Sequence, residues 1–128
     1  MTEIDIRIDG RAGRITLNRP DALNALSWEM CRRIDAALID WTNAPDVSLV
    51  VIDAVGERAF CAGGDLTEMY RTGMAGDFDY GRRFWTDEYR MNRRLFRFPK
   101  PVVSFLQGHV LGGGVGVGCH GSHRIVCD

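Results

Sequence analysis

The chain has 128 residues, of which 45% are hydrophobic and 26% charged, and its formal net charge at pH 7 is −1. This composition is typical of one globular domain and excludes a disordered chain, and the charge gives no bulk attraction to nucleic acid or to a membrane surface. No apolar run approaches the roughly 20 residues that span a bilayer.

The N-terminus and the cysteines suggest a compartment. The first residues are acidic and alternate in polarity, unlike a signal or transit peptide. The four cysteines form no CxxC pair, which favours reduced thiols. We therefore expect a cytoplasmic protein.

The chain begins with two predicted strands. Residues 3–9 alternate polar and apolar, with Ile4, Ile6 and Ile8 on one face, which predicts a half-buried strand. A turn at residues 10–13 leads to a second strand, 14–17, which pairs back as a hairpin. Pro20 lies in the loop that follows, where it blocks a helix.

A helix and a buried strand are predicted next. Ser27 is the expected N-cap of a helix that runs to about Thr42. Its apolar residues at helical spacing are Met30, Ile34, Ala37, Leu38 and Trp41. Residues 48–53 form a continuous β-branched run, which predicts a strand covered on both faces.

A glycine-lined junction follows at residues 56–66. It reads as a strand, a turn containing Gly63 and Gly64, and a helix that starts at Asp65. Asp65 is interpreted either as a simple N-cap or as a catalytic carboxylate.

A long helix is predicted over residues 80–98. Phe84, Glu88, Met91 and Leu95 fall on one helical stripe. Asp87 has Arg83 and Arg90 at helical spacing, but Glu88 has no basic residue three or four positions away. Desolvation would favour its neutral acid, so Glu88 is either a functional group or a carboxylate that reaches water at the edge of the face.

A second glycine-lined junction dominates residues 101–118. A buried strand runs into a glycine-rich turn that opens a helix, and such a helix start offers unpaired N–H groups. If the N–H groups of both junctions converged on one oxygen, they would form an oxyanion hole. A tight turn needed only for packing remains the other interpretation.

Three weaker patterns point to no site. Residues 116–121 match GxGxxG, but too few residues follow for a dinucleotide fold. Neither Ser104 nor Ser122 lies in a nucleophile-elbow motif that would support a Ser–His pair. We expect no metal, because the spacing of the remaining ligand-type residues matches no usual zinc pattern: Cys119, His120, His123 and Cys127.

Three motifs together resemble the crotonase superfamily, the enoyl-CoA hydratase/isomerase group. They are Asn18-Arg19-Pro20 with Leu23-Asn24-Ala25-Leu26, then Ala59 through Asp65, then Pro99-Lys100-Pro101 through Gly114. They occur in family order and near family spacing. The resemblance implies an α/β fold, the crotonase-like ββα spiral, of which residues 1–128 would form the N-terminal part of one domain.

The resemblance also implies a chemistry. It suggests an enzyme that acts on acyl-CoA thioesters, with coenzyme A bound as part of the substrate and no separate cofactor. The N–H groups of Gly64 and Gly113 would form the oxyanion hole. The segment from Ala62 through Asp65 to Leu66 would line the adenine and pantetheine of CoA.

Details favour one branch. Hydratases of the superfamily usually carry a catalytic Glu at the position of Gly116. Residues 87–92, 112–116 and 120–124 look like 3-hydroxyisobutyryl-CoA hydrolases, in which the glutamate matching Glu88 contacts substrate.

Length sets a limit on this assignment. Family members are usually at least twice as long, and the branch's main catalytic Glu would lie after Asp128. We expect a truncated spiral that forms a homo-oligomer to cover apolar surface. The alternatives are an enoyl-CoA hydratase/isomerase and an inactive CoA-binding fragment.

Overall fold

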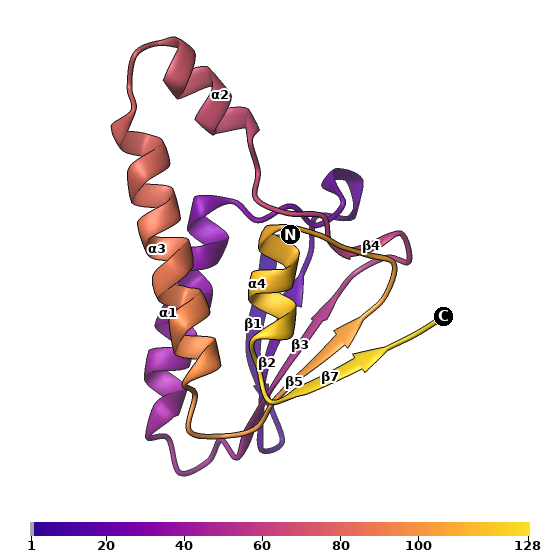
Figure 1. Ribbon diagram of the computed structural model, residues 1–128. Helices are drawn as coiled ribbons and strands as arrows, with labels where there is room; N and C mark the ends of the chain where they lie inside the picture. Colours follow the sequence, from indigo (N-terminus) through magenta and orange to yellow (C-terminus); the bar gives the residue numbers. More distant parts are fainter. Residues whose placement is uncertain (1) are drawn as a thin grey trace.

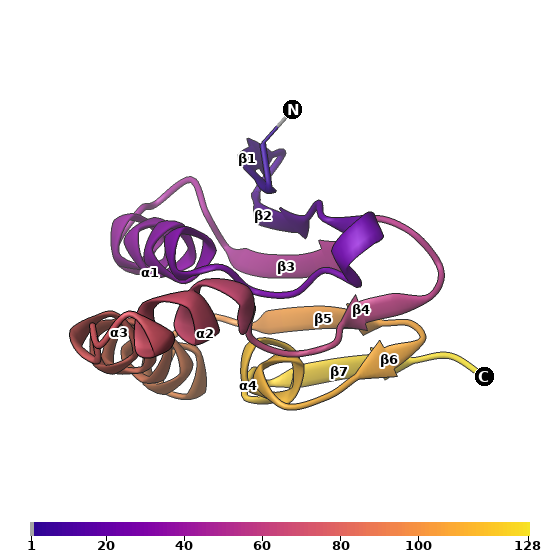
Figure 2. The same ribbon diagram turned by 90° about the horizontal axis from the view of Figure 1, so that it is seen from above.

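The computed structural model describes residues 2–128, which form a five-stranded sheet and a separate two-stranded sheet. Helices α1 and α3 lie beside the larger sheet, and α4 lies between α3 and that sheet (Figures 1 and 2). The strands are β1 (Ile4–Asp9), β2 (Ala12–Leu17), β3 (Leu49–Ala54), β4 (Ala59–Cys61), β5 (Val102–Leu106), β6 (His109–Val110) and β7 (His123–Val126). The helices are a 3-10 turn η1 (Pro20–Ala22), α1 (Trp28–Thr42), α2 (Thr67–Met74), α3 (Asp79–Phe96) and α4 (Gly113–Cys119). Within residues 2–128, none of these helices is long and apolar enough to cross a membrane.

The larger sheet has the order β1-β2-β3-β5-β7. β1 and β2 pair antiparallel, which confirms the predicted hairpin, and the other neighbours pair parallel. Ile4 is 1% exposed, but Ile8 is 54% exposed. The expectation that Ile8 shares the buried face was wrong: β1 is an edge strand, and Ile8 lies beside the hairpin turn, where it pairs with Gly13.

Helix α1 forms over the residues predicted for it. Ser27 caps it, its hydroxyl accepting a hydrogen bond from Met30 N at 3.1 Å. All five predicted apolar residues of the helix are buried. The Trp41 ring packs directly on Gly13, where a Cβ would lie 2.7 Å from Trp41 Cδ2. Any side chain at position 13 would therefore push α1 off the sheet.

The end of α1 is held by Lys100, the only lysine of the chain. Its ammonium donates to the carbonyl oxygens of Trp41 (2.6 Å), Ala44 (2.8 Å) and Val47 (2.7 Å). These carbonyls belong to the last turn of α1 and to the loop after it, where helical partners run out. Lys100 thus ties the segment before β5 to the segment before β3.

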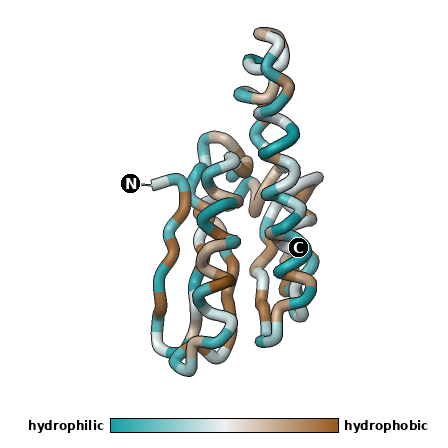
Figure 3. The backbone as a smooth tube through the Cα atoms, turned by 90° about the vertical axis from the view of Figure 1, so that its left-hand side faces the viewer, coloured by the Kyte–Doolittle hydropathy of each residue, from teal (hydrophilic) through white to brown (hydrophobic). Residues whose placement is uncertain are grey.

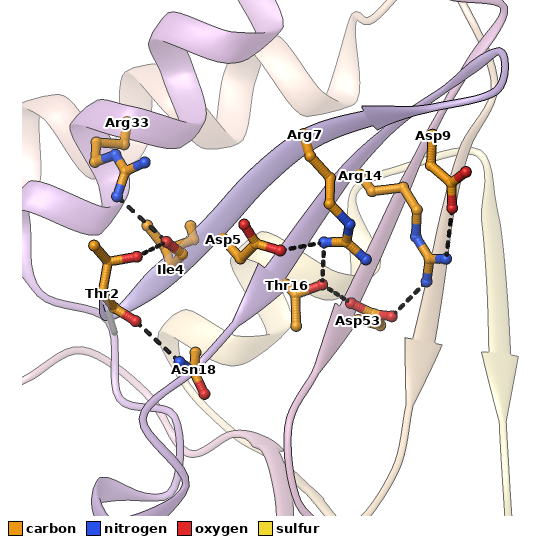
Figure 4. Close-up of polar contacts among 10 residues, drawn as sticks. All are labelled: Thr2, Ile4, Asp5, Arg7, Asp9, Arg14, Thr16, Asn18, Arg33 and Asp53. Carbon is orange, nitrogen blue, oxygen red and sulfur yellow. Dashed lines mark hydrogen bonds and ion pairs between the residues drawn. The ribbon is translucent and has the colours of Figure 1, made fainter.

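Strand β3 is buried on one face only. Val50 and Ile52 are fully buried, whereas Leu49, Val51 and Asp53 are partly exposed. The outer face carries a polar network across β1, β2 and β3, in which Arg14 pairs with Asp53 at 2.7 Å (Figure 4). The prediction of a strand covered on both faces was therefore wrong within the described residues.

Helix α3 carries the predicted buried stripe. Phe84, Glu88, Met91 and Leu95 are its buried residues. The helix ends at Phe96, two residues before the predicted end, and the shorter helix α2 precedes it. Figures 1 and 3 show α2 and the first turns of α3 rising above the rest of the chain.

The predicted ion pairs of Asp87 are half right. Arg90 pairs with it at 3.2 Å, but Arg83 pairs with Asp79 at 3.4 Å instead. The Trp28 indole N–H donates to the other Asp87 carboxylate oxygen at 2.7 Å. Asp87 therefore connects α3 to α1, a contact that the local spacing could not reveal.

Candidate active site

The two short strands β4 and β6 bring the glycine-lined junctions together. They pair in parallel, Ala59 with His109 and Cys61 with Val110. Leu111 N then donates to Cys61 O at 3.1 Å. Because the two strands are parallel, the segments that follow them leave this small sheet at the same end. Residues 62–66 therefore lie next to residues 111–114.

Glycine is required where the two loops touch. Gly63 has φ +134° and Gly112 has φ +53°, conformations that side chains disfavour. A Cβ on Gly114 would overlap with the carbonyl oxygen of Cys61. The glycine run is thus needed for close packing, one of the two interpretations offered by the sequence.

The backbone nitrogens of Gly64 and Gly113 belong to neighbouring residues of the two loops. A Cβ on Gly113 would lie 3.1 Å from Gly64 N. Among residues 2–128, neither N–H donates to a backbone or side-chain acceptor. Gly113 is the first residue of α4, so its N–H has no partner within the helix. Two free donors therefore lie side by side, a geometry that can hold one oxygen.

Glu88 lies at the same point. The residue is 6% exposed, and a Cβ on Gly113 would lie 2.8 Å from its Oε1. Its carboxyl group forms no hydrogen bond or ion pair with any described residue. Burial raises the pKa of Glu88 above its ordinary value. The direction is the one that desolvation was expected to produce.

A hollow of about 420 Å³ opens over this cluster. It lies between the 62–66 loop, α2, α3 and α4. Its lining residues are Gly64, Leu66, Met69, Trp85, Glu88, Tyr89, Asn92, Gly112, Gly113, Val115, Gly116 and His120. Most of the lining is apolar or glycine, with few polar groups, as in sites for small organic ligands.

Only some residues of the segment expected to hold CoA face the hollow. Gly64 and Leu66 line the hollow, and Leu66 is 66% exposed. Ala62 and Asp65 do not line it; Ala62 N donates to Leu23 O at 3.0 Å. Of the four named residues of this segment, two therefore face the hollow and two do not, and its role in holding CoA stays a prediction.

Asp65 has a structural environment. Helix α2 begins at Thr67 with Leu66 as its N-cap, so Asp65, the expected cap, lies one position before the observed one. Its carboxylate accepts from Thr67 N at 2.9 Å and pairs with Arg19 at 3.1 Å. Partial burial alone would raise the pKa of Asp65, but the bonds from Thr67 and Arg19 outweigh it and leave that pKa lowered. Asp65 holds the loop beside Gly64.

Cys61, next to the loop, is a buried thiol. It donates to Gly63 O at 3.6 Å. Burial raises the pKa of Cys61 to about 11, more than the bond to Gly63 lowers it, and the nearby Glu88 raises it further. The sulfur therefore stays protonated at neutral pH and is a packing group rather than a nucleophile.

Asn92 and His120 are among the lining residues of the hollow that the predicted site did not include. Asn92 lies one helical turn after Glu88, and its amide fills the space beside Gly116: a Cβ there would lie 2.7 Å from Asn92 Nδ2. His120 lies at the far end, where its ring meets Phe96 edge-on with centroids 6.3 Å apart. The i, i+4 spacing from Glu88 was a signal that could have identified Asn92.

The weaker patterns of the C-terminal segment assemble no group of metal ligands within residues 2–128. Among residues 2–128, no three His, Cys, Asp or Glu side chains are grouped as metal ligands. Ser122 Oγ lies 2.8 Å from His123 Nδ1 and accepts from Val102 N at 2.9 Å. Ser122 therefore fastens the start of β7 to β5.

Comparisons with known proteins agree with this geometry. The profile of the enoyl-CoA hydratase/isomerase family matches residues 12–128. A curated protein from Danio rerio named 3-hydroxyisobutyryl-CoA hydrolase, mitochondrial, is 41% identical over 93% of this chain. A solved structure of an enoyl-CoA hydratase from Rhodobacter sphaeroides 2.4.1 is 59% identical over 98% of this chain, with a TM-score of 0.96. A carnitinyl-CoA dehydratase from Mycobacterium thermoresistibile is 44% identical over 97% of the chain, with a TM-score of 0.93.

The chain spans only part of these proteins. It covers 31% of the Danio rerio protein, 37% of the Rhodobacter sphaeroides chain and 36% of the Mycobacterium thermoresistibile chain. The described fold therefore corresponds to about a third of each. The α/β fold of the crotonase type that the resemblance implied is confirmed.

The expected cytoplasmic location is contradicted. The relatives from Danio rerio, Gallus gallus and Xenopus tropicalis are all named as mitochondrial proteins, which points to mitochondria. The expectation rested on the composition of the first residues and on cysteine spacing, and neither feature distinguishes these compartments.

Proposed function

Since this chain belongs to the enoyl-CoA hydratase/isomerase family, we propose that its hollow binds the thioester group of an acyl-CoA. The pantetheine arm would lie along Gly64 and Leu66, and the acyl group would extend between α3 and α4. The mainly apolar lining supports this assignment, because an acyl thioester presents one polar carbonyl on an otherwise apolar segment.

The observation that carries the proposal is the pair of free N–H groups at Gly64 and Gly113, side by side and next to Glu88. In our proposal both N–H groups donate to the thioester oxygen. As a nucleophile adds to the carbonyl carbon, that oxygen gains negative charge, and fixed donors stabilise it more than they stabilise the ground state.

Glu88 is the proposed acid–base group. In hydrolysis, water adds to the carbonyl carbon and the carbon–sulfur bond breaks. One proton of the water passes to the departing CoA sulfur, and the acyl group leaves as a carboxylic acid. The raised pKa of Glu88 supports this role, because a carboxyl that titrates nearer to neutral pH exchanges protons more effectively.

Hydrolysis of a 3-hydroxyacyl-CoA is the reaction that we favour. The names of the curated relatives support it. So does position 116, where glycine offers no carboxylate and Asn92 fills the adjacent space. Water supplies the only other reactant, so we propose no cofactor besides the CoA of the substrate.

Hydration of an enoyl-CoA, a lyase reaction, is the second candidate. The name of the Rhodobacter sphaeroides structure, 59% identical, favours it. An inactive CoA-binding fragment is the third candidate, because the chain spans about a third of its relatives.

We also propose a homo-oligomer. Its support is the set of exposed apolar side chains on α3, α4 and β7: Trp85, Tyr89, Phe96, Val115, Ile125 and Val126. Association would remove this surface from water.

The test is a chromatographic assay of this chain with 3-hydroxyisobutyryl-CoA and with crotonyl-CoA. Release of free CoA from the first would support the hydrolase. Conversion of the second to a hydroxyacyl-CoA would support the hydratase. Binding of both without turnover would leave the inactive fragment, and binding of neither by the folded chain would contradict the proposal.

A further inference from the structure

Helices α3 and α4 run side by side in the same direction, and facing residues meet along their seam (Figure 1). Glu88 meets Gly113, Asn92 meets Gly116, and Phe96 meets His120. Along the seam, the carboxyl group of Glu88 comes first, beside the two free N–H groups. The amide of Asn92 follows, and the rings of Phe96 and His120 lie at the far end.

Asn92 is the unusual member of this series. Its Oδ1 is shielded from solvent and has no hydrogen-bond partner in residues 2–128, and its Nδ2 has none either. Buried side-chain amides are normally hydrogen-bonded, because desolvating them without a partner is unfavourable. Yet Asn92 lines the hollow, so a bound molecule can reach its side chain.

The position of Asn92 fixes where such a molecule would meet it. One helical turn, about 6 Å along α3, separates Asn92 from Glu88. If the thioester carbonyl lies at Gly64 and Gly113 and the CoA arm follows the 62–66 loop, the acyl chain runs along the seam. Its β carbon then passes the amide of Asn92.

We propose that Asn92 recognises a hydroxyl group on the β carbon of the acyl chain and so selects hydroxyacyl-CoA over the unsubstituted acyl-CoA. This inference rests on the proposed acyl-CoA function. A hydroxyl both donates and accepts, and the amide offers one donor group and one acceptor, so the two match in either orientation of the amide. A site with an unpaired polar group rejects an analogue that cannot pair with it.

The Asn92 amide packs on Gly116, so a substitution at position 116 is a second way to perturb this amide. A Cβ at position 116 would lie 2.7 Å from Asn92 Nδ2 and 2.9 Å from Oδ1. Replacement of Gly116 by alanine therefore displaces the amide without changing Asn92. The end of an asparagine side chain can give way, so the helix itself is not disturbed.

The experiment measures dissociation constants of two ligands by calorimetry. They are ketone analogues of 3-hydroxyisobutyryl-CoA and isobutyryl-CoA, in which a methylene group between sulfur and carbonyl prevents hydrolysis. We expect the native chain to bind the hydroxylated analogue about tenfold more tightly. Asn92→Leu, nearly equal in size, should abolish this preference and leave the affinity for the isobutyryl analogue within about twofold.

Two further variants make the result specific. Gly116→Ala should also reduce the preference, although Asn92 is present. Arg93→Leu, at the next position of α3 but outside the hollow, should keep it. Equal binding of both analogues by the native chain, or a preference that survives in Asn92→Leu, would overturn this inference alone. Binding of neither analogue would overturn the proposed function, and this inference with it.

Discussion

The carboxyl oxygen of Glu88 lies so close to Gly113 that a Cβ on this glycine would stand 2.8 Å from it. A buried acid and a free backbone donor, 25 positions apart in the sequence, thus occupy one point of the fold. Substitutions at these two positions, and at the residues that support them, have distinct expected effects.

The donor at Gly113 can be removed without a change of helix position. Gly113 is the first residue of α4, where proline is well tolerated but has no N–H. We expect Gly113→Pro to lower the rate of CoA release roughly 100- to 1,000-fold relative to Gly113→Ala. Alanine is the control because it adds a Cβ against Glu88 but keeps the donor. Equal rates for the two variants would show that this N–H has no role.

Glu88 should make the protein less stable as pH rises. Burial raises its pKa, so the folded chain keeps this proton to a higher pH than the unfolded chain, whose Glu pKa is about 4.3. Between these two pKa values the folded state binds more protons, and the free energy of unfolding falls as pH increases. Glu88→Gln cannot ionise, so its free energy of unfolding should exceed that of the native chain at pH 7. The difference should disappear at pH 3, where Glu88 is protonated in both states.

Urea denaturation across this pH range measures the effect. Glu57→Gln, at an exposed position, is the control and should show no such pH-dependent gain. A Glu88→Gln chain that is less stable than the native one at pH 7 would mean that the carboxylate has a partner.

Asp65 should show the opposite pH dependence. Its pKa is lowered overall by Thr67 and Arg19 despite partial burial, so its contribution is present above the unfolded pKa of about 3.9 and is lost as pH falls through the lowered value. Asp65→Asn keeps an acceptor for Thr67 N but loses the ion pair. We expect its free energy of unfolding at pH 7 to be about 1 kcal/mol lower than that of the native chain. This difference should disappear at acidic pH. Asp21→Asn, at an exposed site, should show no comparable loss.

Asn24 should be the most sensitive polar residue of the fold. It is 1% exposed, donates to Val55 O and Ala59 O, and accepts from Arg19 N. It also has φ +55°, which asparagine tolerates better than alanine. We expect Asn24→Ala to reduce the free energy of unfolding by about 3–5 kcal/mol and Asn24→Gly by about 1 kcal/mol less, because glycine relieves the backbone strain. The exposed Asn43→Ala should change it by less than about 1 kcal/mol.

Two helical glycines should respond in opposite ways to alanine. A Cβ on Gly81 in α3 would meet no atom within 4 Å apart from its chain neighbours and the backbone of its own helix, so Gly81→Ala should stabilise by about 0.5–1 kcal/mol. A Cβ on Gly114 in α4 would collide with Cys61 O, so Gly114→Ala should destabilise by about 2–3 kcal/mol. Thermal unfolding of both variants tests whether α4 really packs this closely on β4. Equal shifts would contradict that packing.

The elements with long, regular patterns could be predicted from the sequence. The apolar spacing of α1 and the stripe of α3 identified their buried faces, because a helix repeats its environment every three or four residues. Glu88 stood out for the same reason, as a carboxylate on a face that is otherwise apolar. The resemblance to a family, rather than the pattern, assigned roles to Gly64 and Gly113.

The meeting of Gly64 and Gly113 could not be read from periodicity. It depends on the pairing of β4 with β6, and strands of three and two residues are too short to show an alternating pattern. The contact of Asp87 with Trp28 and that of Asp65 with Arg19 were missed for a similar reason. Trp28 and Arg19 approach them from distant parts of the chain, and only the packed fold brings these side chains within reach.

The hold of Lys100 on the end of α1 has a consequence for chemical modification. An amine reacts with an acylating reagent through its lone pair, and the ammonium of Lys100 is instead donating to three carbonyl oxygens. Acylation of this lysine therefore requires the end of α1 to open first. Because the chain has no other lysine, the rate at which an amine-reactive label enters this side chain reports directly how often that end of the helix comes apart.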